Sequence, residues 1–356
     1  MKTESTSFPP AEPPNNLPMS HSRSARYDVL RVGACLAVIL LHLAATIVME
    51  RDLFGTLDWH LSNALDAATR WCVPVFVMLS GALLLDPQKY TGPGAFWAKR
   101  MSRLLPALIA WPTIYFAWRA FYWHEPLSIE IIARDMALGR PYIHLYFLFL
   151  IAGLYLVTPF LAKALATFSL SQLRDLILIM AGLAMGANLF DFLASSAFTI
   201  FVPYLTYYLA GWYCARLRIE RPSILAFAIV LAATVTTLLT AILVSTRGYD
   251  DRWAFYFYED FSPTDMVMAV GLFLLILQGT ISPRVESIAQ TLAPLTLGVY
   301  VAHPIVVELL RYGYFLAVPI LLRPPYYVPI TFLATCALTF SLVMLMQRVP
   351  GLRRIV

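Results

Sequence analysis

An arginine and a histidine, Arg31 and His42, stand eleven residues apart in the first long apolar stretch of the chain. Eleven residues are close to three helical turns, so both side chains project from one helix face, separated by roughly 16 Å along the axis. A guanidinium group binds anions such as phosphates, and an imidazole exchanges protons near neutral pH. An ionisable residue inside a membrane span costs about 2.5–3.5 kcal/mol on insertion scales, so it is rarely kept without a role. The pair predicts a functional path along one helix face.

The element that carries this pair is one of many apolar stretches. Hydrophobic residues make up 60% of the chain and charged residues only 13%. Apolar runs near the length of a membrane span recur throughout. We therefore expect an all-α, polytopic integral membrane bundle of about ten transmembrane helices, with spans at 29–48, 71–85, 104–121, 142–162, 176–193, 198–215, 224–245, 266–281, 292–310 and 327–346.

The N-terminal segment, residues 1–26, differs from the rest of the chain. Several prolines stand there among Ser, Thr, Glu and Asn. Such a composition cannot bury a core, so the segment is predicted to be a disordered cytoplasmic tail, followed by one membrane domain at 27–356. A cleaved signal peptide is the alternative, but the apolar stretch that follows is too long for one and ends without a clear cleavage site.

The charges in the predicted loops set the expected orientation. Basic residues collect on the side that both termini share, whereas the opposite loops hold fewer of them, including Arg51 and Arg70, together with many acids such as Asp52 and Asp66. The positive-inside rule then places both termini in the cytoplasm. The net charge of +5 reflects this topology. No nucleic-acid partner is expected, since a general basic surface would spread the charge over both sides.

Several kinds of chemistry have no support. The sequence contains no HExxH, Walker, GxGxxG or GxSxG motif, so neither metal-dependent nor nucleotide hydrolysis is indicated, and no metal is expected. The four cysteines, Cys35, Cys72, Cys214 and Cys336, form no CxxC pair and are interpreted as apolar packing residues.

Five elements in order resemble the signature of the membrane acyltransferase family 3, the multispanning O-acyltransferases of cell-surface glycans. They are Arg31-x10-His42, Phe76-x-x-x-Ser80-Gly81, the basic stretch Lys99 to Pro106 with Arg100 and Arg103, His144-Leu-Tyr-Phe-Leu148 with Tyr155-Leu-Val-Thr-Pro159, and Tyr300-x-x-His303-Pro304. The resemblance covers the chain from about residue 26 to its end. Tyr146 departs from it, because the family more often has Trp at this position.

The resemblance implies an acyl-CoA-dependent O-acetyltransferase of the bacterial inner (cytoplasmic) membrane. The donor would be cytosolic acetyl-CoA, and the acceptor a hydroxyl of an extracytoplasmic polysaccharide or lipid-linked sugar of the cell envelope. Succinyl or longer acyl groups stay open. Arg31, Arg100 and Arg103 would hold the phosphates of coenzyme A at the cytoplasmic end. His42 would be the general base, and Arg31 would belong to the catalytic pair.

Four further residues are candidates for substrate binding: His303, Tyr300, Ser80 and His144. His303 follows Tyr300 by three residues, so both share a helix face, although Pro304 makes a role in kinking the helix an alternative. Ser80 is a hydrogen-bond donor or, more simply, a packing residue beside Gly81.

Two charged residues in the spans have other interpretations. Glu308 either pairs with His303 or an arginine or lies near the outer interface, and Arg119 is expected to reach the outer surface beside Trp118 and Trp123.

A secondary transporter is the alternative function. In that case Arg31 would bind a small anion or a sugar, and His42 would relay protons. Transporters often carry inverted repeats, and the sequence shows no convincing internal repeat.

Overall fold

The computed structural model describes residues 21–86, 92–190 and 196–356. Within these ranges every regular element is helical and no strand occurs. The predicted all-α class is confirmed.

Thirteen α-helices make up the described chain, and five short 3-10 helices join or follow them. The α-helices are α1 (His21–Val48), α2 (Leu57–Thr69), α3 (Cys72–Leu84), α4 (Pro93–Phe121), α5 (Ile129–Ala137), α6 (Tyr146–Leu165), α7 (Leu170–Leu189), α8 (Leu205–Cys214), α9 (Pro222–Arg247), α10 (Pro263–Gln278), α11 (Pro283–Leu292), α12 (Thr296–Ala317) and α13 (Pro324–Arg348). The 3-10 helices are η1 (Arg51–Leu53), η3 (Tyr256–Tyr258), η4 (Ala293–Leu295), η5 (Pro319–Leu322) and η6 (Leu352–Arg354).

Nine segments of the described residues are long and apolar enough to cross a membrane, and they overlap nine of the ten predicted spans. The predicted span at 198–215 differs, because only its second half, α8, is a regular helix. Its first half is a series of turns with backbone hydrogen bonds such as Ile200 N–H to Ser196 O and Val202 N–H to Thr199 O. These bonds satisfy backbone groups that an apolar environment would otherwise leave unpaired.

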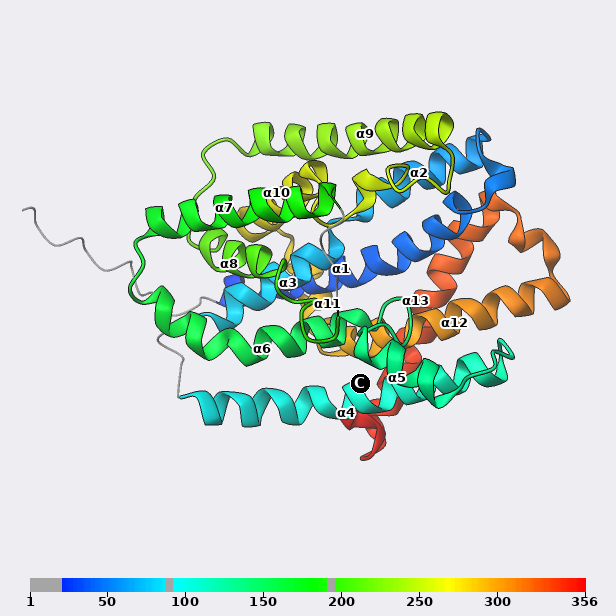
Figure 1. Ribbon diagram of the computed structural model, residues 1–356, viewed down its shortest axis with the longest axis horizontal. Coiled ribbons are helices and arrows are strands. Elements are labelled where there is room, and N and C mark those ends of the chain that lie inside the picture. The colour runs from blue at the N-terminus through cyan, green and yellow to red at the C-terminus, as the bar shows by residue number, and fades with distance from the viewer. Residues whose placement is uncertain (1–20, 87–91, 191–195) are drawn as a thin grey trace, which may run out of the picture.

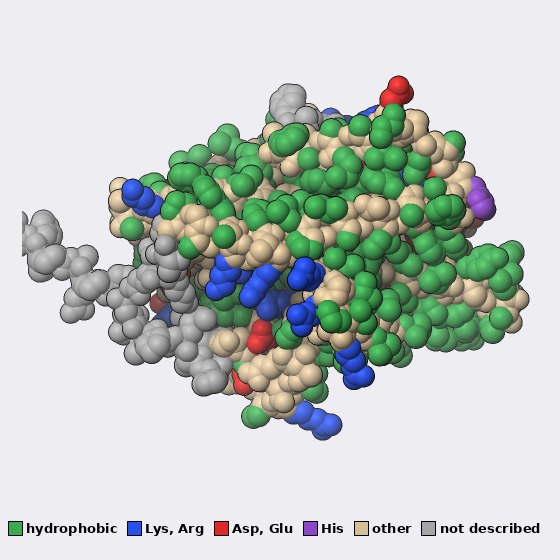
Figure 2. Space-filling model, turned by 90° about the horizontal axis from the view of Figure 1, so that it is seen from below, with side chains coloured by type: hydrophobic (Ala, Val, Ile, Leu, Met, Phe, Trp, Pro, Cys, Tyr) green, Lys and Arg blue, Asp and Glu red, His purple; other side chains and the backbone are tan. Residues whose placement is uncertain are grey.

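The first helix occupies the middle of the bundle (Figure 1). It packs against α2, α3, α10, α11, α12 and α13. On one side α9 packs on α2 and α10, and on the other α4 packs on α6. The face seen in Figure 2 is largely hydrophobic, with a group of Lys and Arg side chains set into it, as expected for a chain that meets both lipid and water. The residues of α1 are therefore in contact with six of the twelve other α-helices of the described chain.

The structure differs from two of the sequence-based predictions. Residues 21–26, predicted to belong to the disordered tail, are the first turns of α1, and the rest of that tail lies outside the described residues. Asp66 and Arg70, predicted to lie in a loop, are in α2 and at its C-terminal cap, where they form an ion pair of 2.6 Å. Asp66 is fully buried. Two opposite charges can be buried when they pair with each other. Charged residues at these positions therefore did not indicate a loop.

Two glycines allow α3 and α8 to approach very closely. A Cβ atom at Gly81 would lie 1.8 Å from the backbone oxygen of Tyr208, and one at Gly211 would lie 1.9 Å from that of Met78. Only a residue without a side chain fits at such a contact, which is the packing expected between helices in membranes.

Candidate active site

Three histidines from distant parts of the chain meet inside the bundle. His42 comes from α1, His303 from α12, and His144 from the turn that precedes α6. The ring centroid of His303 lies 5.3 Å from that of His42 and 5.5 Å from that of His144. His144 and His303 are buried, whereas His42 is half-buried. The first helix thus brings its histidine to two of the predicted substrate-binding residues.

A proline next to His303 explains how its ring is fixed. Pro304 has no backbone N–H, so the carbonyl of Tyr300, four residues earlier, lacks its helical donor. His303 Nδ1 lies 2.7 Å from that carbonyl oxygen. Because a carbonyl only accepts, this hydrogen bond places the proton on Nδ1 and leaves a lone pair on Nε2. Sequence analysis gave two alternatives here, a binding role for His303 and a helix kink at Pro304. Both depend on the same local structure.

His144 is held in a similar way by the same helix. Its Nε2 lies 3.3 Å from the carbonyl oxygen of Val301, and the hydroxyl of Tyr300 donates to the carbonyl oxygen of His144 over 2.6 Å. The hydroxyl of Tyr115 donates to the same Val301 oxygen over 2.9 Å, and its ring lies 5.0 Å from that of His144. The imidazole of His144 is thus fixed between α4 and α12.

Two nitrogen atoms in this group are left without a partner. His144 Nδ1 and His303 Nε2 are buried, and neither has a hydrogen-bond partner in the structure. Both are acceptors in the arrangement described above. A buried acceptor without a donor costs about 1–3 kcal/mol, and such groups often mark functional sites. A ligand hydroxyl group would supply the missing donor.

The predicted donor-binding arginines gather around a different residue, Tyr155 of α6. Arg31, Arg100 and Arg103 all lie within electrostatic range of its hydroxyl. Arg31 also contacts Asp28 one turn earlier, at 3.5 Å. Arg100 and Arg103 form no ion pair with an acidic residue of the described chain, so their guanidinium groups are available to an anion. The three arginines thus share one tyrosine as a neighbour, and their role in holding coenzyme A stays a prediction.

The two groups have the same separation along two antiparallel helices. On α1, eleven residues separate Arg31 from His42, and on α6 and its preceding turn, eleven separate His144 from Tyr155. Eleven residues of helix span about 16 Å. Since His42 lies beside the His144 group and Arg31 lies near Tyr155, the arginine and histidine groups are about three helical turns apart along both segments.

Other predicted residues lie outside both groups. Ser80 donates to the carbonyl oxygen of Phe76 over 2.9 Å, so its proton is used within α3, and its role in substrate binding stays a prediction. Glu308 pairs with neither His303 nor an arginine, since its carboxylate accepts from Trp118, Trp123 and Tyr142.

Arg119 and the four cysteines also lie outside the arginine and histidine groups. Arg119 forms ion pairs of 2.6 Å with Glu125 and with Asp135. Three cysteines are buried and Cys336 is partly buried; all four are free thiols.

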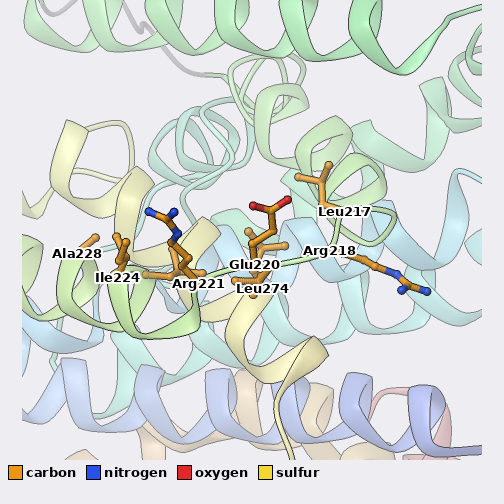
Figure 3. A pocket seen from close by; sticks show the side chains of 9 residues that line it. Leu217, Arg218, Glu220, Arg221, Ile224, Ala228 and Leu274 are labelled. Carbon is orange, nitrogen blue, oxygen red and sulfur yellow. The ribbon is translucent and has the colours of Figure 1, made fainter.

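Neither a metal centre nor the cavity in Figure 3 belongs to this site. No group of three or more His, Cys, Asp or Glu side chains in the described ranges is arranged to hold a metal ion. The cavity in Figure 3, about 580 Å³, lies where α8 leads into α9, and Arg218 and Arg221 point away from each other along it. None of the predicted site residues lines it.

Sequence reasoning missed several contributors. Tyr115 was not singled out, and Tyr155 was named only as part of a motif without a role, because a tyrosine in an apolar helix has no signature of its own. The i, i+4 spacing of Asp66 and Arg70 was a usable signal, since opposite charges at that spacing pair on one helix face.

The comparison with known proteins gives one family match. A family model described as an acyltransferase domain matches residues 24–344 of the chain. No curated protein and no solved structure matches it. Because the match spans both residue groups and nearly the whole sequence, the chain belongs to acyltransferase family 3, a family of membrane acyltransferases.

Proposed function

We propose that this membrane acyltransferase moves an acyl group, in the simplest case acetyl, from coenzyme A to a hydroxyl group of a cell-envelope glycan. The observation that supports the proposal is the position of two chemically different residue groups about three helical turns apart along α1. One end offers positive charge around Tyr155, and the other offers three imidazoles with two unpaired buried nitrogens. Acyl transfer from a thioester needs an anchor for the donor and a base for the acceptor.

The arginine end suits the nucleotide part of the donor. Coenzyme A carries several phosphate groups, and guanidinium groups bind phosphate oxygens through two parallel hydrogen bonds. Arg100 and Arg103 have no acidic partner in the described chain, and Arg31 has only the longer contact to Asp28. With the nucleotide held there, the pantetheine arm would extend along α1 toward His42.

The histidine end suits the chemical step. The acceptor oxygen attacks the thioester carbonyl carbon while His42 takes the hydroxyl proton. The carbon–sulfur bond then breaks, and the proton passes from His42 to the departing thiolate. His303 and His144, fixed by the backbone of α12, would orient the reacting groups through Nε2 and Nδ1.

The proposed topology places the arginine end in the cytoplasm, where coenzyme A is made. Both termini would then face the cytoplasm of a bacterial cell and the acceptor would face the other side of the inner membrane. A reporter fused after Val356 tests this topology. Ile355 accepts a hydrogen bond of 2.8 Å from Trp111, so the reporter needs a flexible linker. A fused reporter that works only in the periplasm should be inactive. If such a reporter is active, the proposed orientation is wrong.

The function is tested with the purified protein in liposomes. Radiolabelled acetyl-CoA is supplied with de-O-acetylated envelope glycan from the cells that make the protein. Label should enter the glycan as an alkali-sensitive ester, and His42→Ala should abolish this transfer. His60→Ala is the matched control, because His60 is an exposed histidine of α2 outside the site. Solute uptake without any transfer of label would instead support a transporter.

A further inference from the structure

A polar cavity of about 620 Å³ lies at the histidine end of the bundle, outside the residues assigned so far. Its wall comes from the start of α6, the end of α7, the turns before α8 and the segment that precedes α10. The lining includes Arg140, Tyr146, Asn188, Trp253 and Glu259. Neither the arginine group around Tyr155 nor the cavity of Figure 3 contributes to it.

We propose that this cavity binds the acceptor, and that the acceptor part bound there is an uncharged sugar ring. The inference rests on the proposed acyl transfer and adds to it the place and the chemical class of the acceptor. It is carried by three observations: the balance of charge in the cavity, its unpaired and aromatic side chains, and its connection to His42.

The charges that surround the cavity are balanced. Arg70, Arg140 and Arg252 line it together with Glu259 and Asp260, and Arg70 is paired with the buried Asp66. Asp66 does not line the cavity but neutralises Arg70, so two guanidinium groups and two carboxylates remain along the wall. An anionic acceptor would meet as many like charges as opposite ones. Sugar hydroxyl groups both donate and accept, so a wall that carries both kinds of hydrogen-bonding group suits an uncharged ring.

Aromatic and amide groups complete the cavity. Trp253 and Tyr256 both line it, with ring centroids 5.7 Å apart. Flat apolar faces of this kind pack against the C–H face of a sugar ring. Asn188 lines the same cavity, and its amide nitrogen is buried without a hydrogen-bond partner. A buried donor without an acceptor is an observation that points to a ligand oxygen.

The cavity adjoins the catalytic histidines through two of its walls. Arg70, which lines it, lies close enough to His42 for its charge to act on that ring. Ile143 and Tyr146 line the cavity on either side of His144, whose ring is 5.5 Å from that of His303. A sugar held in the cavity would therefore lie beside the turn that carries His144 and beside Arg70, which acts on His42.

The test measures transfer of labelled acetyl to two fractions of the de-O-acetylated envelope glycan, separated by anion exchange into neutral and acidic parts. Label should enter the neutral fraction. Trp253→Ala and Asn188→Ala should each raise the KM for that fraction about tenfold, a usual effect for the loss of one contact. The KM for acetyl-CoA and the slow hydrolysis of acetyl-CoA without glycan should stay unchanged. Trp253→Phe keeps the aromatic face and should restore most of the affinity.

The matched control is Trp123→Ala, because Trp123 is an exposed tryptophan that binds Glu308 and lies outside the cavity. If the wild type transfers acetyl but Trp253→Ala and Asn188→Ala leave the glycan KM unchanged, the acceptor binds elsewhere. If only Trp123→Ala raises the glycan KM, the acceptor binds near Glu308. Label confined to the acidic fraction would overturn the uncharged class. If the wild type transfers no acetyl to either fraction, the proposed function itself fails.

Discussion

The imidazole of His303 donates from Nδ1 to the backbone carbonyl oxygen of Tyr300, one turn earlier on the same helix, over 2.7 Å. In an ordinary helix the backbone N–H of residue 304 would occupy that oxygen. Because Pro304 has none, the oxygen is available to the side chain. The proline thereby sets which nitrogen of His303 faces the site.

Replacing Pro304 with alanine tests this relationship. Pro304→Ala supplies an N–H that competes for the Tyr300 oxygen, so the ring of His303 should lose its fixed orientation. We expect kcat to fall about tenfold or more with an unchanged KM for acetyl-CoA, while the melting temperature stays the same or rises. Steady-state kinetics and thermal unfolding in detergent measure both. Wild-type kcat in this variant would show that the proline does not position His303.

The contact between α3 and α8 should tolerate no side chain at its glycines. Gly81→Ala and Gly211→Ala would each place a methyl group within 2 Å of a backbone oxygen. Overpacking of this kind costs about 1–3 kcal/mol, so both variants should melt at lower temperature. Gly182→Ala in α7 is the control, because nothing lies within 4 Å of its added Cβ, and its melting temperature should not fall. Equal melting temperatures for all three variants would contradict the close approach of α3 and α8.

The buried ion pair of Asp66 and Arg70 should matter far more than an exposed one. Asp66→Asn leaves the Arg70 guanidinium, whose side chain is 17% exposed, without its counter-charge. Removing one partner of a buried pair costs about 3–5 kcal/mol. The exposed pair of Arg51 and Asp250 is the control, so Asp250→Asn should have no measurable effect. Thermal unfolding of the two variants side by side checks this. Equal losses of melting temperature would show that burial does not decide the strength of the pair.

Glu125 should give the protein a small pH-dependent stability outside the membrane. Its hydrogen bond to Arg119 lowers the pKa of the Glu125 carboxyl below its ordinary value. A lowered pKa in the folded state stabilises the protein above the unfolded pKa, which is about 4.3, and this gain is lost as the pH falls through the folded value. The pair is partly exposed, so the gain is at most about 1 kcal/mol.

The comparison of wild type with Glu125→Gln measures that contribution. The difference in melting temperature should be full above about pH 4.3 and should close at lower pH. Arg119 keeps its ion pair with Asp135 in both proteins, so the variant stays folded. A difference that is constant at all pH values would show that the ionisation of Glu125 is not involved.

The sequence predicted those features that depend on one helix at a time. Apolar length located nine of the spans, and helical spacing placed Arg31 and His42 on one path. The segment at 198–215 was recognised as apolar, but its first half forms turns, because composition alone does not report helix regularity.

Features that depend on two distant segments were out of reach. The meeting of His144 with His303 requires the turn before α6 to pack on α12, for which a single sequence carries no signal. The polar cavity combines five separate segments, and its aromatic residues look like ordinary interfacial ones when each is taken alone.

The two-ended path is tested most directly by measuring acetyl-CoA affinity and turnover separately in variants of its ends. Arg31→Ala, Arg100→Ala and Arg103→Ala should each weaken acetyl-CoA binding by about one to two decades, the loss of a charge-assisted contact of about 1.5–3 kcal/mol. Arg218→Ala, an exposed arginine of the cavity in Figure 3, is their control and should bind normally.

His42→Ala should bind acetyl-CoA with nearly wild-type affinity while kcat falls by about two to four decades, the usual range for a lost general base. His42→Gln keeps a hydrogen-bonding side chain but cannot accept a proton at neutral pH, so it should be equally slow. Turnover of His42→Gln at the wild-type rate would contradict the account, because His42 would then serve packing or hydrogen bonding alone.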